Sequence, residues 1–127
     1  MPRGTETVLV VEDEEPVKRM VRGILTRLGY TVLDAADGQQ ALDVCGSRKE
    51  PIHVMVTDVV MPGMAGPDLA RAVKLLRPET RIIFMSGYTE NSMLQHDVIE
   101  PEANFLQKPF APEEFARRVR EVLDRKD

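Results

Sequence analysis

Short apolar runs alternate with stretches of helical periodicity along the chain, and this rhythm constrains the fold more than any other feature. Five runs have the length of a β-strand, and they cover residues 8–11, 31–35, 53–58, 81–86 and 104–107. The segments that follow them carry apolar residues three and four positions apart, the spacing of one helix face. Such alternation is typical of βα units stacked on a parallel sheet. The sequence therefore predicts an α/β fold, a five-stranded parallel sheet with helices on both faces.

Proline and glycine mark several helix ends. Pro16 suits the first turn of the first helix and Gly29 suits its end, because proline lacks an amide hydrogen and glycine adopts positive φ readily. The second helix is predicted to open at residues 37–38, the third to span about 67–76, and the last to begin near residue 112. Periodicity is weakest over residues 88–103, where a short fourth helix is predicted.

Length and composition predict one domain in a reducing compartment. A chain of 127 residues fits a single core, with residues 1–6 as a flexible lead-in and residues 7–125 as the domain. The single Cys45 cannot form an internal disulfide and is interpreted as a buried small hydrophobe. No N-terminal segment combines basic residues with an apolar stretch suited to export or membrane spanning. We therefore expect a cytoplasmic location and no direct membrane contact.

The charge distribution argues against nucleic-acid binding. The chain has 17 Lys and Arg residues against 21 Asp and Glu residues, and its formal net charge is −4. The basic residues are spread along the sequence, whereas a nucleic-acid-binding domain usually gathers them in a stripe or patch.

Polar side chains follow four of the five predicted strands. The first run ends in consecutive acids, in the segment TVLVVEDEE, where Glu12 and Asp13 come directly after the strand. The third strand ends in Asp58, the fourth in Ser86, and the fifth leads to Lys108. In an open parallel sheet the ligand site lies outside the carboxyl ends of the strands, so these residues are expected at one edge.

These residue types together suit magnesium-assisted phosphoryl transfer. Crowded carboxylates repel one another unless a cation intervenes, and hard oxygen ligands suit Mg²⁺. We expect Glu12 and Asp13 to bind the ion partly through water, Asp58 directly, and the backbone carbonyl of Val60 to supply a further oxygen. Asp58 is then a plausible nucleophile that forms an acyl phosphate, with Lys108 on the phosphoryl oxygens. Taken singly, such residues are more often turn formers or solvated side chains, but their joint placement favours a site.

The motifs that hold these residues occur in the order and spacing of a known family. Segments VVEDE, VTDVVMPGMAGPDLA, FMSGY and NFLQKPF closely resemble the receiver domain of two-component response regulators, over about residues 7–123. The resemblance implies a doubly wound, flavodoxin-like sheet of strand order 2-1-3-4-5. It also implies that Asp58 accepts a phosphoryl group from a phosphohistidine, with Mg²⁺ held by Glu12, Asp13, Asp58 and the Val60 carbonyl, and that Lys108 contacts the phosphoryl group.

The same resemblance implies a conformational switch. Ser86 would be the hydroxyl that moves toward the phosphoryl group, and Phe105 the aromatic ring that swings inward and alters the face of helix four, strand five and helix five. The Lys108-Pro109 peptide bond is expected to be cis. Two residues depart from the usual pattern, because Glu12 replaces a shorter Asp and Phe105 replaces a Tyr, which leaves that ring without a hydroxyl. Val60 and Tyr88 stand at positions that influence water access in the family, and both lack a carboxylate or amide to orient attacking water, so we expect slow self-dephosphorylation.

Several functions compete for this sequence. A phosphatase of the haloacid dehalogenase type also uses a strand-ending Asp with Mg²⁺, but it needs a second acid where this chain has Val60. A degenerate receiver that only binds partners would lack the acceptor or the lysine, and both are present. We expect a signalling domain without external substrates, a monomer or weak dimer that partners a histidine kinase or a histidine phosphotransfer domain. The chain resembles the carboxyl-terminal receiver of hybrid sensor histidine kinases, and a free-standing regulator is the alternative.

Overall fold

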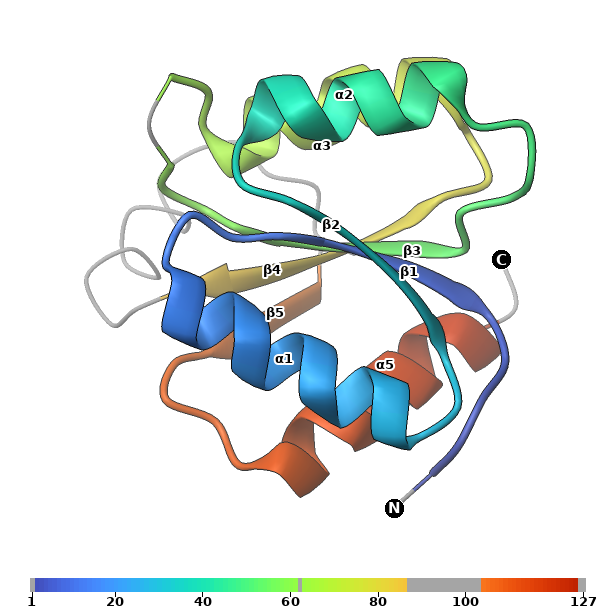
Figure 1. Cartoon of the computed structure of the whole chain (residues 1–127), viewed down its shortest axis with the longest axis vertical. Coiled ribbons are helices and arrows are strands. Elements are labelled where there is room, and N and C mark those ends of the chain that lie inside the picture. The colour runs from blue at the N-terminus through green and yellow to red at the C-terminus, as the bar shows by residue number, and fades with distance from the viewer. Residues whose placement is uncertain (1, 62, 87–103, 126–127) are drawn as a thin grey trace.

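The structure is a three-layer α/β sandwich around one parallel sheet (Figure 1). It is a computed structural model that describes residues 2–61, 63–86 and 104–125. The sheet has five strands in the order β2-β1-β3-β4-β5, which confirms the predicted order. In chain order the described elements are β1 (Thr7–Val11), α1 (Glu15–Arg27), β2 (Thr31–Ala35), α2 (Gly38–Ser47), β3 (Val54–Asp58), α3 (Gly66–Leu76), β4 (Arg81–Ser86), β5 (Asn104–Gln107) and α5 (Pro112–Asp124). The predicted fourth helix lies outside the described residues.

The helices cover both faces of the sheet, with α1 and α5 on one side and α2 and α3 on the other (Figure 1). Alternate residues of β1 lie on opposite faces of the sheet. Val8 and Val10 pack with α1 and α5, and Leu9 and Val11 pack with α2 and α3. All residues of β1 and β3 are buried. Covering on both sides explains why these strands read as unbroken apolar runs rather than as alternating patterns.

Residues with known preferences for helix ends stand at the ends of the first two helices. Glu14 is the N-cap of α1, with Glu15 and Pro16 in the first turn, and Gly29 just beyond the helix has a φ of 101°. Asp37 caps α2, because its side chain accepts a hydrogen bond from the amide of Gln40 at 2.9 Å. None of the helices in the described ranges combines the length and hydrophobicity needed to cross a bilayer.

Residues just before β1 contact the body of the domain. The amide of Gly4 donates to the carbonyl of Leu28 at 3.1 Å. The guanidinium of Arg120 on α5 donates to the Glu6 carboxylate at 2.5 and 3.1 Å and to the Tyr30 hydroxyl at 3.4 Å. Residues 3–6, which we expected to be flexible, therefore connect the ends of α1 and α5. The domain boundary at residue 7 stays a prediction.

The topology brings the carboxyl ends of four strands together. Because all strands run in the same direction, β1, β3, β4 and β5 end at the same edge of the sheet. β3 is the central strand, with β1 and β4 as its neighbours. Its last residue, Asp58, is therefore flanked by the residues that follow β1 and by the end of β4.

Candidate functional site

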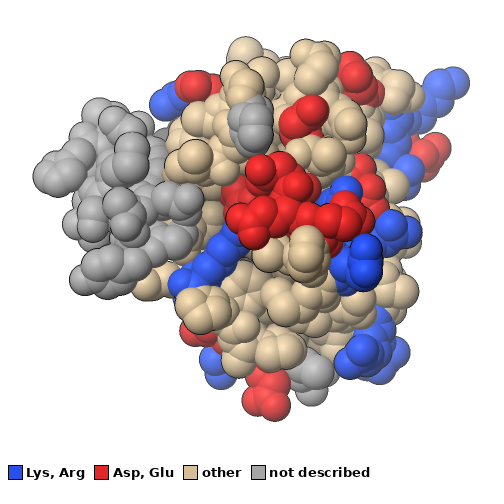
Figure 2. Space-filling view, turned by 60° about the vertical axis from the view of Figure 1, so that its left-hand side comes forward, with Lys and Arg blue, Asp and Glu red and all other residues tan. Residues whose placement is uncertain are grey.

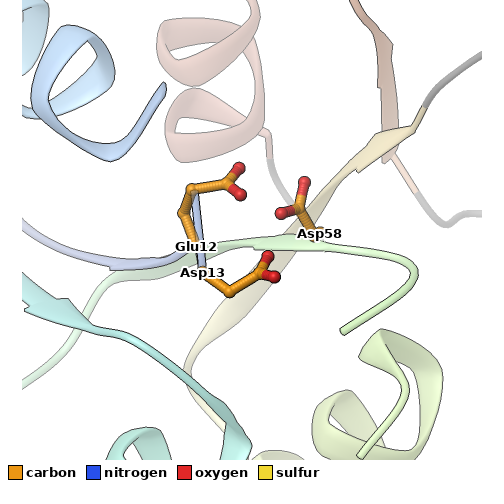
Figure 3. Close-up of side chains that lie close together, drawn as sticks. All are labelled: Glu12, Asp13 and Asp58. Carbon is orange, nitrogen blue, oxygen red and sulfur yellow. The ribbon is translucent and has the colours of Figure 1, made fainter. Parts of the chain in front are cut away.

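Three carboxylates converge at this edge. Glu12 and Asp13 follow β1 directly, and Asp58 ends β3; one oxygen from each lies within 4.8 Å of the others (Figure 3). Glu12 and Asp58 are buried, whereas Asp13 is exposed. Seen from outside, Asp and Glu side chains gather on this face of the molecule (Figure 2). The predicted acidic cluster is thus formed, and its Asp13 side chain is open to solvent.

The start of α3 packs closely against the backbone of Asp58 and Val59. The amide of Gly66, the first residue of α3, donates to the carbonyl of Val59 at 2.7 Å. A Cβ atom at Gly66 would lie 2.2 Å from the carbonyl oxygen of Asp58, so only glycine permits this approach. The amide of Val59 also donates to the carbonyl of Met85 at 3.2 Å, which extends the pairing of β3 with β4 past Asp58.

Lys108 supplies a positive charge to the cluster. Its Nζ lies 2.6 Å from Asp58 Oδ1 and 3.1 Å from Glu12 Oε2. Its backbone amide donates to the carbonyl of Ser86 at 2.8 Å, which joins the segment after β5 to the end of β4. The Lys108-Pro109 peptide bond is cis, as the family resemblance implied. The ammonium group therefore bridges two of the three carboxylates.

Both oxygens of Glu12 have donors. Oε1 accepts from the amide of Glu14 at 3.1 Å, and Oε2 accepts from Lys108. The residue is fully buried, so these contacts replace the hydration that its carboxylate would otherwise have. The longer side chain of glutamate, compared with aspartate, spans the distance between the start of α1 and Lys108.

The cluster carries more negative than positive charge. Burial raises the pKa of Asp58 to about 8, the Glu12 carboxylate beside it adds to the rise, and Lys108 opposes it. Burial also acts to raise the pKa of Glu12, but hydrogen bonds with Asp58, Glu14 and Lys108 outweigh it and lower that pKa. Three acidic side chains thus share one ammonium group. A hard divalent cation such as Mg²⁺ fits this set, which offers only oxygen ligands and has one side open to water.

Ser86 ends β4 and Val60 follows β3, so both predicted residues belong to this edge of the sheet. Ser86 is fully buried at the end of β4 and follows Met85, the register partner of Asp58. Val60 stands two positions after Asp58 and is 53% exposed, so an apolar side chain is open to solvent at that position. Tyr88 lies outside the described residues. The ligand role of the Val60 carbonyl and the switch role of Ser86 stay predictions.

Phe105 and two residues that sequence reasoning missed complete the surroundings. Phe105 on β5 is half-buried, and its ring stacks on that of Phe84 with a centroid distance of 5.5 Å. Phe84 was read only as part of an apolar strand, and no local signal distinguishes it from its neighbours. Gly66 lies inside one of the family motifs, and a glycine at the first turn of a helix is the signal that could have indicated a close backbone approach.

Comparison with known proteins identifies similar domains. A family model described as the response regulator receiver domain matches residues 8–120. The chain is 39% identical over 125 residues to the sensor kinase CckA of Brucella abortus (strain 2308), an alignment that covers 98% of this chain and 13% of that protein. It is 29% identical over 118 residues to the sporulation initiation phosphotransferase F of Bacillus subtilis (strain 168), covering 93% of this chain and 94% of that protein.

Solved structures give the same result. The receiver domain of the hybrid histidine kinase CckA superposes with a TM-score of 0.79 at 30% identity, covering 93% of this chain and 99% of that one. The chemotaxis protein CheY4 of Vibrio cholerae superposes with a TM-score of 0.82 at 30% identity, covering 94% and 99%. The chain therefore spans the full length of some relatives and only a small part of the sensor kinase.

Proposed function

The chain belongs to the response regulator receiver domain family, and from this membership we propose that it accepts a phosphoryl group on Asp58 in a two-component phosphorelay. The observation that carries the proposal is the position of the Asp58 carboxylate, buried beside Glu12 and Asp13 and 2.6 Å from the Lys108 ammonium. A buried acid at the end of the central strand, with the Lys108 ammonium and the exposed Asp13 beside it, suits attack on phosphorus.

Glu12, Asp13, Asp58 and the carbonyl of Val60 would hold the Mg²⁺ ion. Bound there, the ion would neutralise charge that develops on the phosphoryl oxygens during transfer. The open side at Asp13 leaves room for water and for the donor.

In the transfer step, a carboxylate oxygen of Asp58 attacks the phosphorus of a phosphohistidine. The O–P bond forms, the N–P bond to the imidazole breaks, and the departing imidazole takes up a proton. Lys108 then releases the carboxylate oxygen and pairs with the phosphoryl oxygens. The acyl phosphate adds negative charge that the Lys108 ammonium is already placed to meet.

The response to phosphorylation would involve Ser86 and Phe105. The Ser86 hydroxyl donates to the new phosphoryl oxygens, and the Phe105 ring moves inward. These shifts alter the face that includes β5 and α5, together with the predicted fourth helix. Because the two residues are on the neighbouring strands β4 and β5, a change at one reaches the other across a single strand pair.

A histidine kinase or a histidine phosphotransfer domain is the proposed partner, with α1 and the segment at Pro109 as the docking surface. Met20 on α1 is 44% exposed and would contribute apolar contact.

The similarity to part of a sensor kinase favours a receiver from a hybrid sensor histidine kinase. Full-length similarity to a phosphotransferase and to a chemotaxis protein supports the alternative, a free-standing single-domain regulator. In either case we propose a cytoplasmic domain, a monomer or weak dimer.

Incubation with phosphoramidate and Mg²⁺ tests the proposal directly. Intact-protein mass spectrometry should show the gain of one phosphoryl group, and the gain should be lost in Asp58→Asn and on omission of Mg²⁺. Turnover of a generic aryl phosphate would instead favour the phosphatase reading. We expect no turnover, because Val60 occupies the place of the second acid that such an enzyme requires.

A further inference from the structure

Phe84 and Phe105 form a cross-strand aromatic pair. They are register partners on β4 and β5, and their rings stack at a centroid distance of 5.5 Å with an interplanar angle of 23°. Phe84 is 3% exposed, whereas Phe105 is half-buried. The geometry is in the range that aromatic pairs prefer. The ring that is expected to move therefore rests on one that is fixed in the core.

Phe84 also packs toward the phosphoacceptor. It shares a small apolar cluster with Val59 and Ala70, against which Phe105 packs from outside. Val59 follows Asp58 in the chain and is hydrogen-bonded through its amide to β4. Ser86 lies two positions beyond Phe84 and projects on the same side of the sheet. The Phe84 ring thus contacts the surroundings of Asp58 on one side and Phe105 on the other.

Because Phe105 lacks the hydroxyl of the usual Tyr, its stacking on Phe84 matters more for the position of its ring. Phe105 has no polar group, so no hydrogen bond can hold its ring in an outer position. Ring stacking on Phe84 is the specific contact that the described residues offer it. Among those residues the chain has one other stacked pair, Phe110 and Phe115, with a centroid distance of 5.3 Å and an angle of 19°. That pair includes a core residue of the opposite face, so it provides a matched control.

We propose that Phe84 is a positioning residue for the switch, holding the Phe105 ring in its half-buried resting position. This inference rests on the proposed function, since it concerns the movement of Phe105 after Asp58 is modified. Loss of the Phe84 ring weakens the resting state more than the switched state. A ligand that favours the switched state then binds more tightly, because less free energy is spent on the conformational change.

Fluorine NMR can measure both consequences. The chain has four Phe residues, so labelling with 4-fluorophenylalanine gives few signals, each assigned by its loss in a Phe→Leu variant. The variants are Phe84→Leu and Phe84→Met, whose unbranched side chain adapts to irregular space, with Phe110→Leu as the control. Each protein is titrated with beryllofluoride and Mg²⁺, which mimic an acyl phosphate. The signal of Phe105 is recorded before and after.

In both Phe84 variants the free protein should show the Phe105 signal displaced toward its beryllofluoride-bound position. Beryllofluoride should bind about two- to tenfold more tightly, as expected for the loss of one aromatic stack. Phe110→Leu should change neither property. If the Phe84 variants lose stability but keep the wild-type Phe105 signal and affinity, the residue is only structural and the proposal is wrong. If Phe84→Leu does not fold, the Phe105 signal and the beryllofluoride affinity of Phe84→Met test the proposal.

The two proposals can fail separately. If wild-type protein shows no response to beryllofluoride and Mg²⁺, the phosphoacceptor function fails. If wild-type protein responds and the Phe84 variants bind beryllofluoride with wild-type affinity, the function stands and only the role of Phe84 fails.

Discussion

The Nζ atom of Lys108 lies 2.6 Å from Oδ1 of Asp58, although 50 residues separate them in the sequence. The same ammonium group is 3.1 Å from Glu12 Oε2. In the ion-free protein, Lys108 is therefore the counterion of the buried acids. Under the proposed function this ammonium group would pair with the phosphoryl oxygens, so its contacts with the acids would change when Asp58 is phosphorylated.

Replacement of Lys108 by methionine tests this counterion role. We expect Lys108→Met to lower the free energy of unfolding by about 1–2 kcal/mol without Mg²⁺, because two buried acidic side chains lose the ammonium group that contacts both of them. Mg²⁺ should bind more tightly to the variant, since no ammonium competes for the same oxygens. Urea unfolding and NMR titration with Mg²⁺ measure both effects. Lys49→Met, at an exposed position, is the control. Weaker Mg²⁺ binding by Lys108→Met than by wild type would contradict the account.

Gly66→Ala tests the backbone contact beneath Asp58. A Cβ atom there would lie 2.2 Å from the Asp58 carbonyl oxygen, so β3 or α3 must shift, and we expect a loss of about 1–3 kcal/mol in unfolding free energy. Gly23→Ala on α1 is a matched control, because its Cβ atom would meet nothing within 4 Å. That variant should gain about 0.5–1 kcal/mol from helix propensity. Equal effects of the two substitutions in urea unfolding would show that the contact is unimportant.

The ion pair between Glu6 and Arg120 predicts a pH dependence of stability. The Arg120 guanidinium, which donates to both Glu6 oxygens, lowers the pKa of Glu6 from 4.5 to about 2. A lowered pKa means that the pair contributes stability above pH 4.5, and that this contribution is lost as the pH falls from 4.5 toward 2. Partial exposure screens the pair, so we expect about 1 kcal/mol.

Glu6→Gln measures that contribution. The difference in unfolding free energy between wild type and Glu6→Gln should be largest near neutral pH and should shrink as the pH falls below about 4.5. Glu121→Gln, at an exposed position on the same helix as Arg120, is the control. A difference that stays constant across this range would mean that the ion pair does not contribute as described.

Val60 predicts a long-lived phosphorylated state. Its exposed apolar side chain stands two positions after Asp58 and has no group to orient attacking water. Substitution by glutamine adds an amide there, so we expect Val60→Gln to lose its phosphoryl group severalfold faster than wild type. Decay of the phosphorylated mass after removal of the donor gives both rates. A wild-type half-life of only seconds would contradict the prediction.

Much of the fold could be predicted from local sequence. The runs at β2, β4 and β5 have the bounds that the structure shows, because short apolar and β-branched stretches flanked by glycine, proline or charged residues define strands well. Parallel strand direction then places the end residues at one edge, so the meeting of Glu12, Asp13, Asp58 and Lys108 could be expected from the sequence.

Long-range side-chain pairing could not be predicted in the same way. Glu6 and Arg120 are separated by 114 positions, and neither lies in a pattern that indicates the other. The stack of Phe84 on Phe105 depends on the register of β4 with β5, and apolar runs do not encode register. Contacts of Lys108 with Glu12 depend on the length of the glutamate side chain, which sequence reasoning treated only as a departure from the family pattern.

Borohydride trapping tests the central claim most directly. Protein treated with phosphoramidate and Mg²⁺ is reduced with borohydride, which converts an aspartyl phosphate to homoserine, and the modified position is located by peptide mass spectrometry. We predict homoserine at position 58 alone, with no modification in Asp58→Asn. Homoserine at Asp13, or the same yield of trapped product in Asp58→Asn, would contradict the account.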